Sequence, residues 1–119
     1  MAGYRLTHAA RADIISILAW SHEQLGEGAR KRYEALIATA IRDAASRSVD
    51  AGRRPRPQLG EGVFSWHLSP SRARAPGEKV HRARHFLICR RDGETLVIGR
   101  VPHDAMDLRR HVDPHQTWD

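Results

Sequence analysis

Apolar residues recur at helical spacing in the first part of the chain and predict a helix with one buried face. The apolar positions are Ala10, Ile14, Ile17, Leu18 and Leu25. Thr7 offers a side-chain oxygen that can cap the start of this helix. Gly26 and Gly28 predict its end, because glycine accepts the left-handed backbone that a helix C-terminus favours.

A second run of apolar residues predicts a longer helix directly afterwards. The stripe consists of Ala29, Tyr33, Leu36, Ile37, Ala40, Ile41 and Ala44. Arg30, Glu34 and Arg42 fall off the stripe and belong to the solvent side. Since the connection between the two helices is short, we expect them to pack antiparallel as an αα-hairpin.

The rest of the chain predicts strands around turn signals. A short strand at residues 4–6 precedes the first helix, and two prolines within residues 52–57 forbid a continuing helix. Residues 64–68 alternate between apolar and polar, and residues 85–90 are apolar on both faces. Asp92–Gly93 predicts a hairpin turn, so residues 95–101 should return as the antiparallel partner. Pro102 ends that strand, and Asp104 can cap a short last helix through His111.

This order of elements predicts an α+β fold. It comprises an N-terminal strand, an α-helical hairpin, a three-stranded antiparallel meander and a short C-terminal helix. The 119 residues fit a single domain spanning 1–119.

The charge adds a clue about partners. Lys and Arg number 20 against 14 Asp and Glu, which gives a formal net charge of +6. Such a charge on a small protein favours nucleic acid, an acidic protein segment or an anionic membrane as partner. The plainer interpretation is a solvated basic surface.

Composition excludes several other classes of protein. Cys89 is the only cysteine, which rules out an intramolecular disulfide, and its apolar surroundings favour a buried filler over a nucleophile. No signal peptide or apolar run long enough to span a membrane is present, so we expect a cytoplasmic protein without a membrane partner. The histidines show no metal-ligand spacing, so we expect no metal and no cofactor.

Two segments near the ends of the chain carry a family pattern. In residues 4–14 a short strand ends in Thr7, and the following helix carries Asp13. In residues 98–108 an Arg-Val strand runs into His103 and then a Met-Asp pair. Trp20, the Leu25-Gly26 helix stop and the hairpin at residues 90–94 fit as well. Together these segments resemble toxins of the RelE/ParE superfamily of type II toxin–antitoxin systems, closest to the ParE-like branch. The loop between residues 55 and 80 is longer than usual for these toxins.

The resemblance implies a helical hairpin on a sheet and a cognate ParD-like antitoxin whose C-terminal segment wraps over the toxin. The target depends on the branch. ParE-like members are taken to poison DNA gyrase without cutting nucleic acid, whereas RelE-like members cut messenger RNA on the ribosome. A nucleic-acid-binding module without toxicity is a third alternative, because a +6 charge favours some binding to DNA or RNA at low salt.

The candidate ribonuclease residues are Arg84, Arg100 and His103, since cationic groups can steady a phosphorane and a histidine can transfer protons. RelE-like relatives often follow the histidine with a tyrosine, but here Asp104 follows it, which favours the gyrase alternative. His103 can instead tether the last helix, and Arg100 can pair with Asp104 or Asp107.

Two further surfaces are predicted. An amphipathic antitoxin helix needs exposed apolar surface with basic neighbours, and the candidates are Arg11, Ile15, Trp20, Leu25 and Arg30. Trp20 and the apolar residues beside it could equally be core. The candidates for contact with the target or with nucleic acid are Arg72, Arg74, Lys79, Arg82 and Arg84. Trp118 is close to the C-terminus, and we expect it to be loose.

Overall fold

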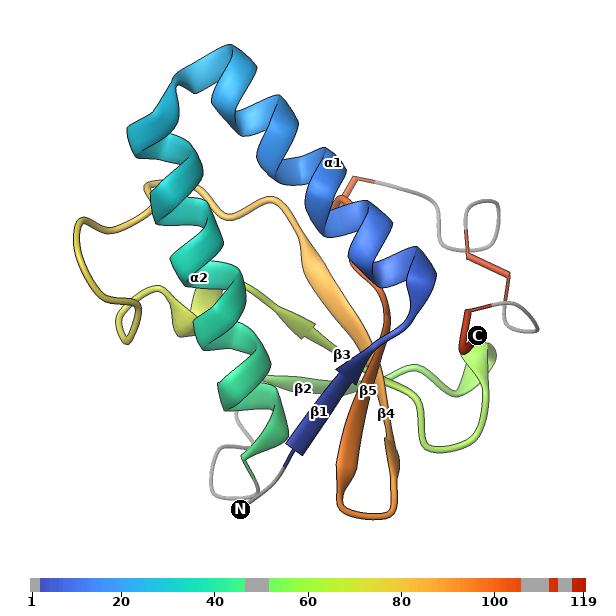
Figure 1. The fold of residues 1–119 in the computed structure, drawn as a ribbon. Helices are drawn as coiled ribbons and strands as arrows, with labels where there is room; N and C mark the ends of the chain where they lie inside the picture. The colour runs from blue at the N-terminus through green and yellow to red at the C-terminus, as the bar shows by residue number, and fades with distance from the viewer. Residues whose placement is uncertain (1–2, 47–51, 106–111, 114–116) are drawn as a thin grey trace.

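The computed structural model describes residues 3–46, 52–105, 112–113 and 117–119, and it shows two helices on a sheet (Figure 1). The elements in chain order are β1 (Gly3–Leu6), α1 (His8–Leu25), α2 (Glu27–Ala45), β2 (Arg53–Pro55), η1 (Pro57–Leu59), β3 (Phe64–His67), η2 (Ser69–Ser71), β4 (Phe86–Asp92) and β5 (Thr95–Arg100). The predicted α+β class is confirmed. Most of the predicted last helix falls on residues 106–111, which lie outside the described residues.

The sheet has five strands in the order β1-β5-β4-β3-β2. The predicted meander is its centre, because β3, β4 and β5 pair antiparallel in sequence order. β1 is added parallel to β5. The helical hairpin stands between β1 and β2 in the chain, and these two strands lie at opposite edges of the sheet (Figure 1). β2 is the strand that the sequence did not predict, since the prolines there pointed only to a break. It lies at the sheet edge, where a strand tolerates Pro55 because one side of its backbone needs no partner strand.

Thr7 fixes the start of α1 as predicted. Its Oγ1 accepts the Ala10 backbone N–H at 3.1 Å and donates to the Gly99 carbonyl at 2.8 Å, so it joins the helix to β5. Gly26 ends α1 with a φ of 92°. The prediction that Gly28 also ends this helix was wrong, because α2 begins at Glu27 and contains it.

The core lies between the hairpin and one face of the sheet. The α2 stripe is buried from Tyr33 to Ala44, as predicted. On α1, Ala10 is buried and Ile14, Ile17 and Leu18 pack partly buried against the core. Leu25 is 65% exposed, so its predicted place on the buried face was wrong. It is the last residue of α1, where the tip of the hairpin extends beyond the sheet (Figure 1).

A smaller apolar cluster covers the other face of the sheet. It consists of Leu59, Val63, Phe86, Ile88 and Val112, with Trp118 partly buried against it. The Arg90 guanidinium carbon lies 4.5 Å from the centre of the Trp118 ring. The expectation of a loose Trp118 was therefore wrong. The sheet has room for this ring because Gly99 carries no side chain beneath it.

Two further predictions concern the interior and the membrane. Cys89 is fully buried in β4, as a filler residue should be, and burial raises the pKa of its thiol. Within the described residues, neither helix has the length and apolarity needed to cross a bilayer.

Candidate protein-binding groove

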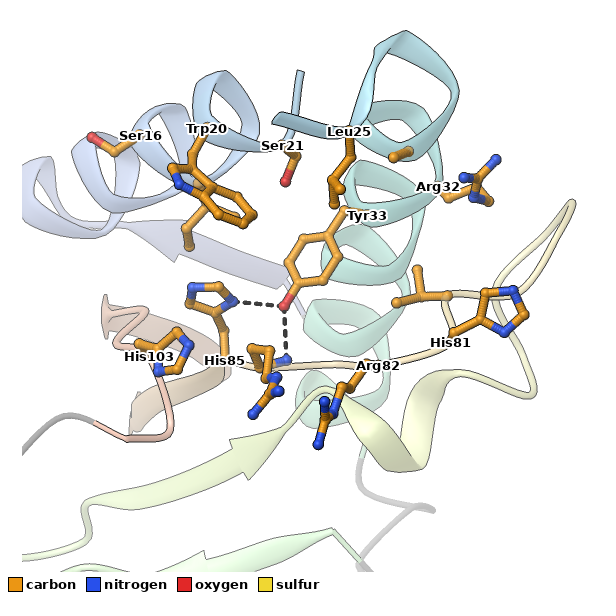
Figure 2. A pocket seen from close by; sticks show the side chains of 14 residues that line it. Ser16, Trp20, Ser21, Leu25, Arg32, Tyr33, His81, Arg82, His85 and His103 are labelled. Atoms are coloured by element: carbon orange, nitrogen blue, oxygen red, sulfur yellow. Dashed lines mark hydrogen bonds between the residues drawn. The ribbon is translucent and has the colours of Figure 1, made fainter. Parts of the chain in front are cut away.

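A groove of about 840 Å³ lies between the helical hairpin and the segment that leads into β4 (Figure 2). We call it the hairpin groove. It is lined by Ser16, Ile17, Trp20, Ser21, Leu25, Ala29, Arg32, Tyr33, Val80, His81, Arg82, Arg84, His85 and His103. Both helices, the loop before β4 and the segment after β5 thus contribute to one concave surface.

The upper wall of the groove is apolar and open to solvent. Trp20 and Leu25 are 59% and 65% exposed, and both side chains line the same groove. Tyr33 of α2 lies beneath Leu25 (Figure 2), and Ala29 of α2 and Val80 of the loop also line the groove. Exposed apolar side chains that border a concave surface are typical of a site for another molecule.

The lower rim is basic. It carries His81, Arg82 and Arg84, and Arg32 of α2 adds a further cation at the level of Leu25 (Figure 2). No Asp or Glu is among the lining residues described. Arg32 reaches Glu78 at 3.4 Å, but both side chains are exposed and this pair contributes little. The combination of an apolar wall and a basic rim fits a ligand that is both apolar and acidic.

Tyr33 and His85 form the polar centre of the groove. The Tyr33 hydroxyl lies 2.6 Å from His85 Nδ1 and accepts the backbone N–H of Arg84 at 3.1 Å (Figure 2). Burial raises the pKa of Tyr33 to about 12, so the phenol keeps its proton. An O–H donated to Nδ1 gives both groups a partner and leaves the histidine proton on Nε2. Burial, and then the charge of His103, lowers the pKa of His85 to about 4, so its ring is neutral at neutral pH.

His103 and Asp104 lie next to this centre. The His103 ring meets the His85 ring edge to face, with centroids 5.2 Å apart, and His103 Nδ1 accepts the Ala105 N–H at 3.0 Å. Asp104 Oδ2 lies 3.1 Å from His67 Nε2. Partial burial alone would raise the pKa of Asp104, but the bond from His67 and the charges of His103 and Arg84 lower it on balance.

Arg100 has a structural partner that the sequence did not indicate. Its Nε donates to Asp13 Oδ2 at 2.7 Å and its Nη2 donates to Asp13 Oδ1 at 3.2 Å. Asp13 also accepts the Val101 backbone N–H at 2.9 Å. Of the two pairings that we expected for Arg100, Asp104 instead pairs with His67, and Asp107 lies outside the described residues.

The predicted target-binding cations separate into two groups. Arg82 and Arg84 are exposed on the groove, and Lys79 is exposed in the loop before it. Arg72 donates to the Val80 carbonyl at 2.7 Å, and Arg74 pairs with Asp43 at 2.7 Å. Arg72 and Arg74 thus hold the long loop against itself and against α2.

The predicted antitoxin-binding residues separate as well. Trp20 and Leu25 line the hairpin groove, whereas Arg11, Ile15 and Arg30 do not. Sequence reasoning missed Tyr33 as a residue of the groove, because it lies on the apolar stripe of α2. Its hydroxyl was the available signal, since a buried phenol needs a hydrogen-bond partner.

Comparison with known proteins gives two matches. The family model described as "ParE toxin of type II toxin-antitoxin system, parDE" matches residues 4–108. Seven chains of solved structures match, among them one titled "Chromosomal ParDE TA system from P. aeruginosa". That chain is 20% identical, with a TM-score of 0.59 over 87% of this chain and 96% of its own. At this identity the structural likeness supports the fold. None of the curated proteins matches the sequence.

Proposed function

Because the chain belongs to the ParE toxin family of type II toxin–antitoxin systems, we propose that it inhibits DNA gyrase by protein–protein contact in the cytoplasm. We propose further that a cognate ParD-like antitoxin neutralises it. The observation that carries both parts is the hairpin groove, with its exposed Trp20 and Leu25 above a basic rim. Large exposed aromatic and apolar side chains beside arginines are the usual anchors of protein interfaces.

The groove suits an amphipathic antitoxin segment. Its apolar residues would cover Trp20 and Leu25, and its acidic residues would face Arg82 and Arg84. A disordered tail that folds as it binds can follow such an elongated concave surface. On α1, the antitoxin therefore contacts the side of the helix that carries Trp20.

The chemistry of the neighbouring residues supports inhibition by contact over RNA cleavage. Arg100 is engaged by Asp13 at two points, so it is not poised for a phosphate. The carboxylate of Asp104 lies 3.6 Å from His103 Nδ1 and would repel an RNA phosphate there. The three candidate ribonuclease residues therefore do not present one cationic centre.

The gyrase proposal is tested with purified components. Toxin is added to gyrase and relaxed plasmid, and both supercoiling and trapped DNA cleavage are measured. We expect inhibition and an accumulation of cleaved plasmid, and the toxin already bound to its antitoxin serves as the matched control. Normal supercoiling without cleaved DNA at saturating toxin would show the target to be something else.

RNA cleavage is the second candidate, and one observation favours it. The groove brings Tyr33, His85 and His103 together, so a phenol stands near the histidines although no tyrosine follows His103 in the sequence. Mapping of transcript ends after induction separates the alternatives. Codon-phased cuts that disappear in His103→Ala would establish cleavage, and their absence together with gyrase inhibition would exclude it as the mode of toxicity.

A further inference from the structure

A second cavity lies on the face of the sheet opposite the helices. Its volume is about 410 Å³, and it is lined by Gly52, Arg53, Arg54, Arg56, Ser65, His67, Pro70 and Phe86. We call it the β2–β3 cavity. The Arg-Arg-Pro-Arg run that breaks the helical pattern of the sequence supplies three of its residues. The groove described above shares none of these lining residues.

Two of the three arginines have no acidic partner in the part of the chain that the structure describes. Arg53 contacts other parts of the fold, because it donates to the Ala44 and Ser46 carbonyls and lies over the Phe64 ring. Among the described residues, neither Arg54 nor Arg56 forms an ion pair, and the lining residues include no carboxylate. Partial burial, and then the charge of Arg54, lowers the pKa of Arg56, so the two guanidinium groups repel each other. Two uncompensated cations at one cavity favour an anionic ligand.

A buried hydroxyl completes the donor set. Ser65 is 4% exposed, lines the cavity, and accepts the Arg56 Nε–H at 3.0 Å through its Oγ. Its own O–H remains available as a donor beside the two guanidinium groups. His67 forms the wall but offers no donor to the ligand, because its Nδ1 accepts the Ser69 N–H and its Nε2 donates to Asp104. Phe86 closes the floor, with the Arg56 guanidinium 5.7 Å from its ring centre.

We propose that the β2–β3 cavity binds a phosphate of a nucleic-acid backbone through Arg54, Arg56 and the hydroxyl of Ser65. Guanidinium groups present paired donors that match phosphate oxygens. The same face of the sheet continues with Arg90 over Trp118, which packs in one cluster with Phe86. Cations at several places on one face suit a polymer with one charge per nucleotide better than they suit a single carboxylate.

The test measures binding of the purified toxin to short fluorescein-labelled oligonucleotides by fluorescence anisotropy. The site variant is Arg54→Gln with Arg56→Gln. The matched control is Arg5→Gln with Lys31→Gln, two exposed cations on β1 and α2 that do not line the cavity. Both variants lower the formal charge of +6 by two, so they separate a site from general attraction. Arg54→Gln alone is a further variant, because this exposed side chain can be replaced without removing the bond to Ser65.

We expect the site variant to weaken binding roughly tenfold or more and to lower the salt dependence by about two counterions. Arg54→Gln alone should show a smaller loss in the same direction, and the control pair should change the dissociation constant less than about threefold. Single-stranded RNA and duplex DNA are separate arms, and preference for either one assigns the nucleic acid. The proposal would be overturned if the site variant and the control pair lost affinity for the oligonucleotide equally. Competition by polyglutamate as effective as competition by an unlabelled oligonucleotide would also overturn it. This binding measurement contains no gyrase, so its result is independent of whether the protein inhibits gyrase.

Discussion

Arg100 at the end of β5 and Asp13 in α1 form a two-point ion pair, although they are 87 residues apart in the chain. The two side chains are 24% and 20% exposed, so solvent screens the pair only partly. Asp13 binds the Val101 N–H as well and thus also fixes the backbone where the strand ends. Asp13 in the opening segment and Arg100 in the closing segment therefore join α1 to β5.

Replacing Asp13 with asparagine should destabilise the protein. The shape of the side chain is retained, but the partly buried Arg100 guanidinium loses the charge of Asp13. We expect a loss of about 2 kcal/mol in the free energy of unfolding. Urea denaturation followed by circular dichroism measures this loss.

The matched control for that prediction is Glu34→Gln. Glu34 is 55% exposed and pairs with Arg30 one helical turn away, so its loss should cost less than about 0.5 kcal/mol. If Asp13→Asn is no more destabilising than Glu34→Gln, the ion pair to Arg100 does not hold the helix to the sheet.

The protein should lose stability as the pH falls from about 6.5 to about 4. Burial, and then the charge of His103, lowers the pKa of His85 to about 4, whereas in the unfolded chain the pKa is near the ordinary 6.5. Between these values the unfolded state binds more protons, so acidification favours unfolding. The pH dependence of the urea midpoint tests this, and an NMR titration of the His85 ring reports its pKa directly.

His85→Asn isolates this contribution, because the asparagine oxygen can still accept the Tyr33 hydroxyl. The variant should show a shallower loss of stability over the same pH range, and His22→Asn, at an exposed position of α1, is the matched control. Parallel curves for wild type and His85→Asn would show that His85 does not protonate on unfolding.

Local patterns in the sequence were sufficient for the elements with strong periodicity. The α2 stripe, the Thr7 cap and the Asp92–Gly93 turn each depend on neighbouring residues, and all three are confirmed. β2 could not be predicted in this way, because its three residues become a strand only by pairing with β3. The partner of Arg100 could not be predicted for the same reason. Two residues that pair across the fold do not stand at a recognisable spacing in the sequence.

In the candidate site, too, local features could be predicted from the sequence and tertiary contacts could not. The sequence left Trp20 open between the core and an exposed surface of α1, and its place in one groove with Arg82 and Arg84 depends on how the long loop packs. Arg72 and Arg74 were predicted to bind a partner, and they hold that loop by bonds to Val80 and Asp43. Charge on a loop did not reveal which arginines remain available and which are used within the fold.

Gly99→Ala should loosen the C-terminal segment. A Cβ at this position would lie 2.5 Å from Thr117 Cγ2 and 2.8 Å from Trp118, closer than atoms can approach without a shift. We expect a loss of about 1–3 kcal/mol in the free energy of unfolding. A change in tryptophan fluorescence should accompany it, because Trp118 would leave its contact with Arg90. Gly3→Ala is the control, since a Cβ there meets no atom within 4 Å. Equal stability of the two variants would mean that the segment adjusts without cost.

Trp20→Ala should weaken antitoxin binding far more than Ile15→Ala, a prediction that depends on the proposed role of the hairpin groove. The two side chains are similarly exposed, at 59% and 62%, and both lie on α1. They are five residues apart and thus about 140° apart around the helix axis, and only Trp20 lines the groove. Truncating an aromatic anchor at the centre of an interface costs about 2 kcal/mol or more, which is roughly a thirtyfold loss of affinity.

The measurement for Trp20 is calorimetric titration with the cognate antitoxin. Neither substitution should alter the melting temperature by much, because both side chains are exposed, so a change in affinity reports the interface itself. Ile15→Ala should reduce the affinity less than about fivefold. If Ile15→Ala weakens binding as strongly as Trp20→Ala, the antitoxin covers the outer side of α1, and the hairpin groove remains open for the toxin's target.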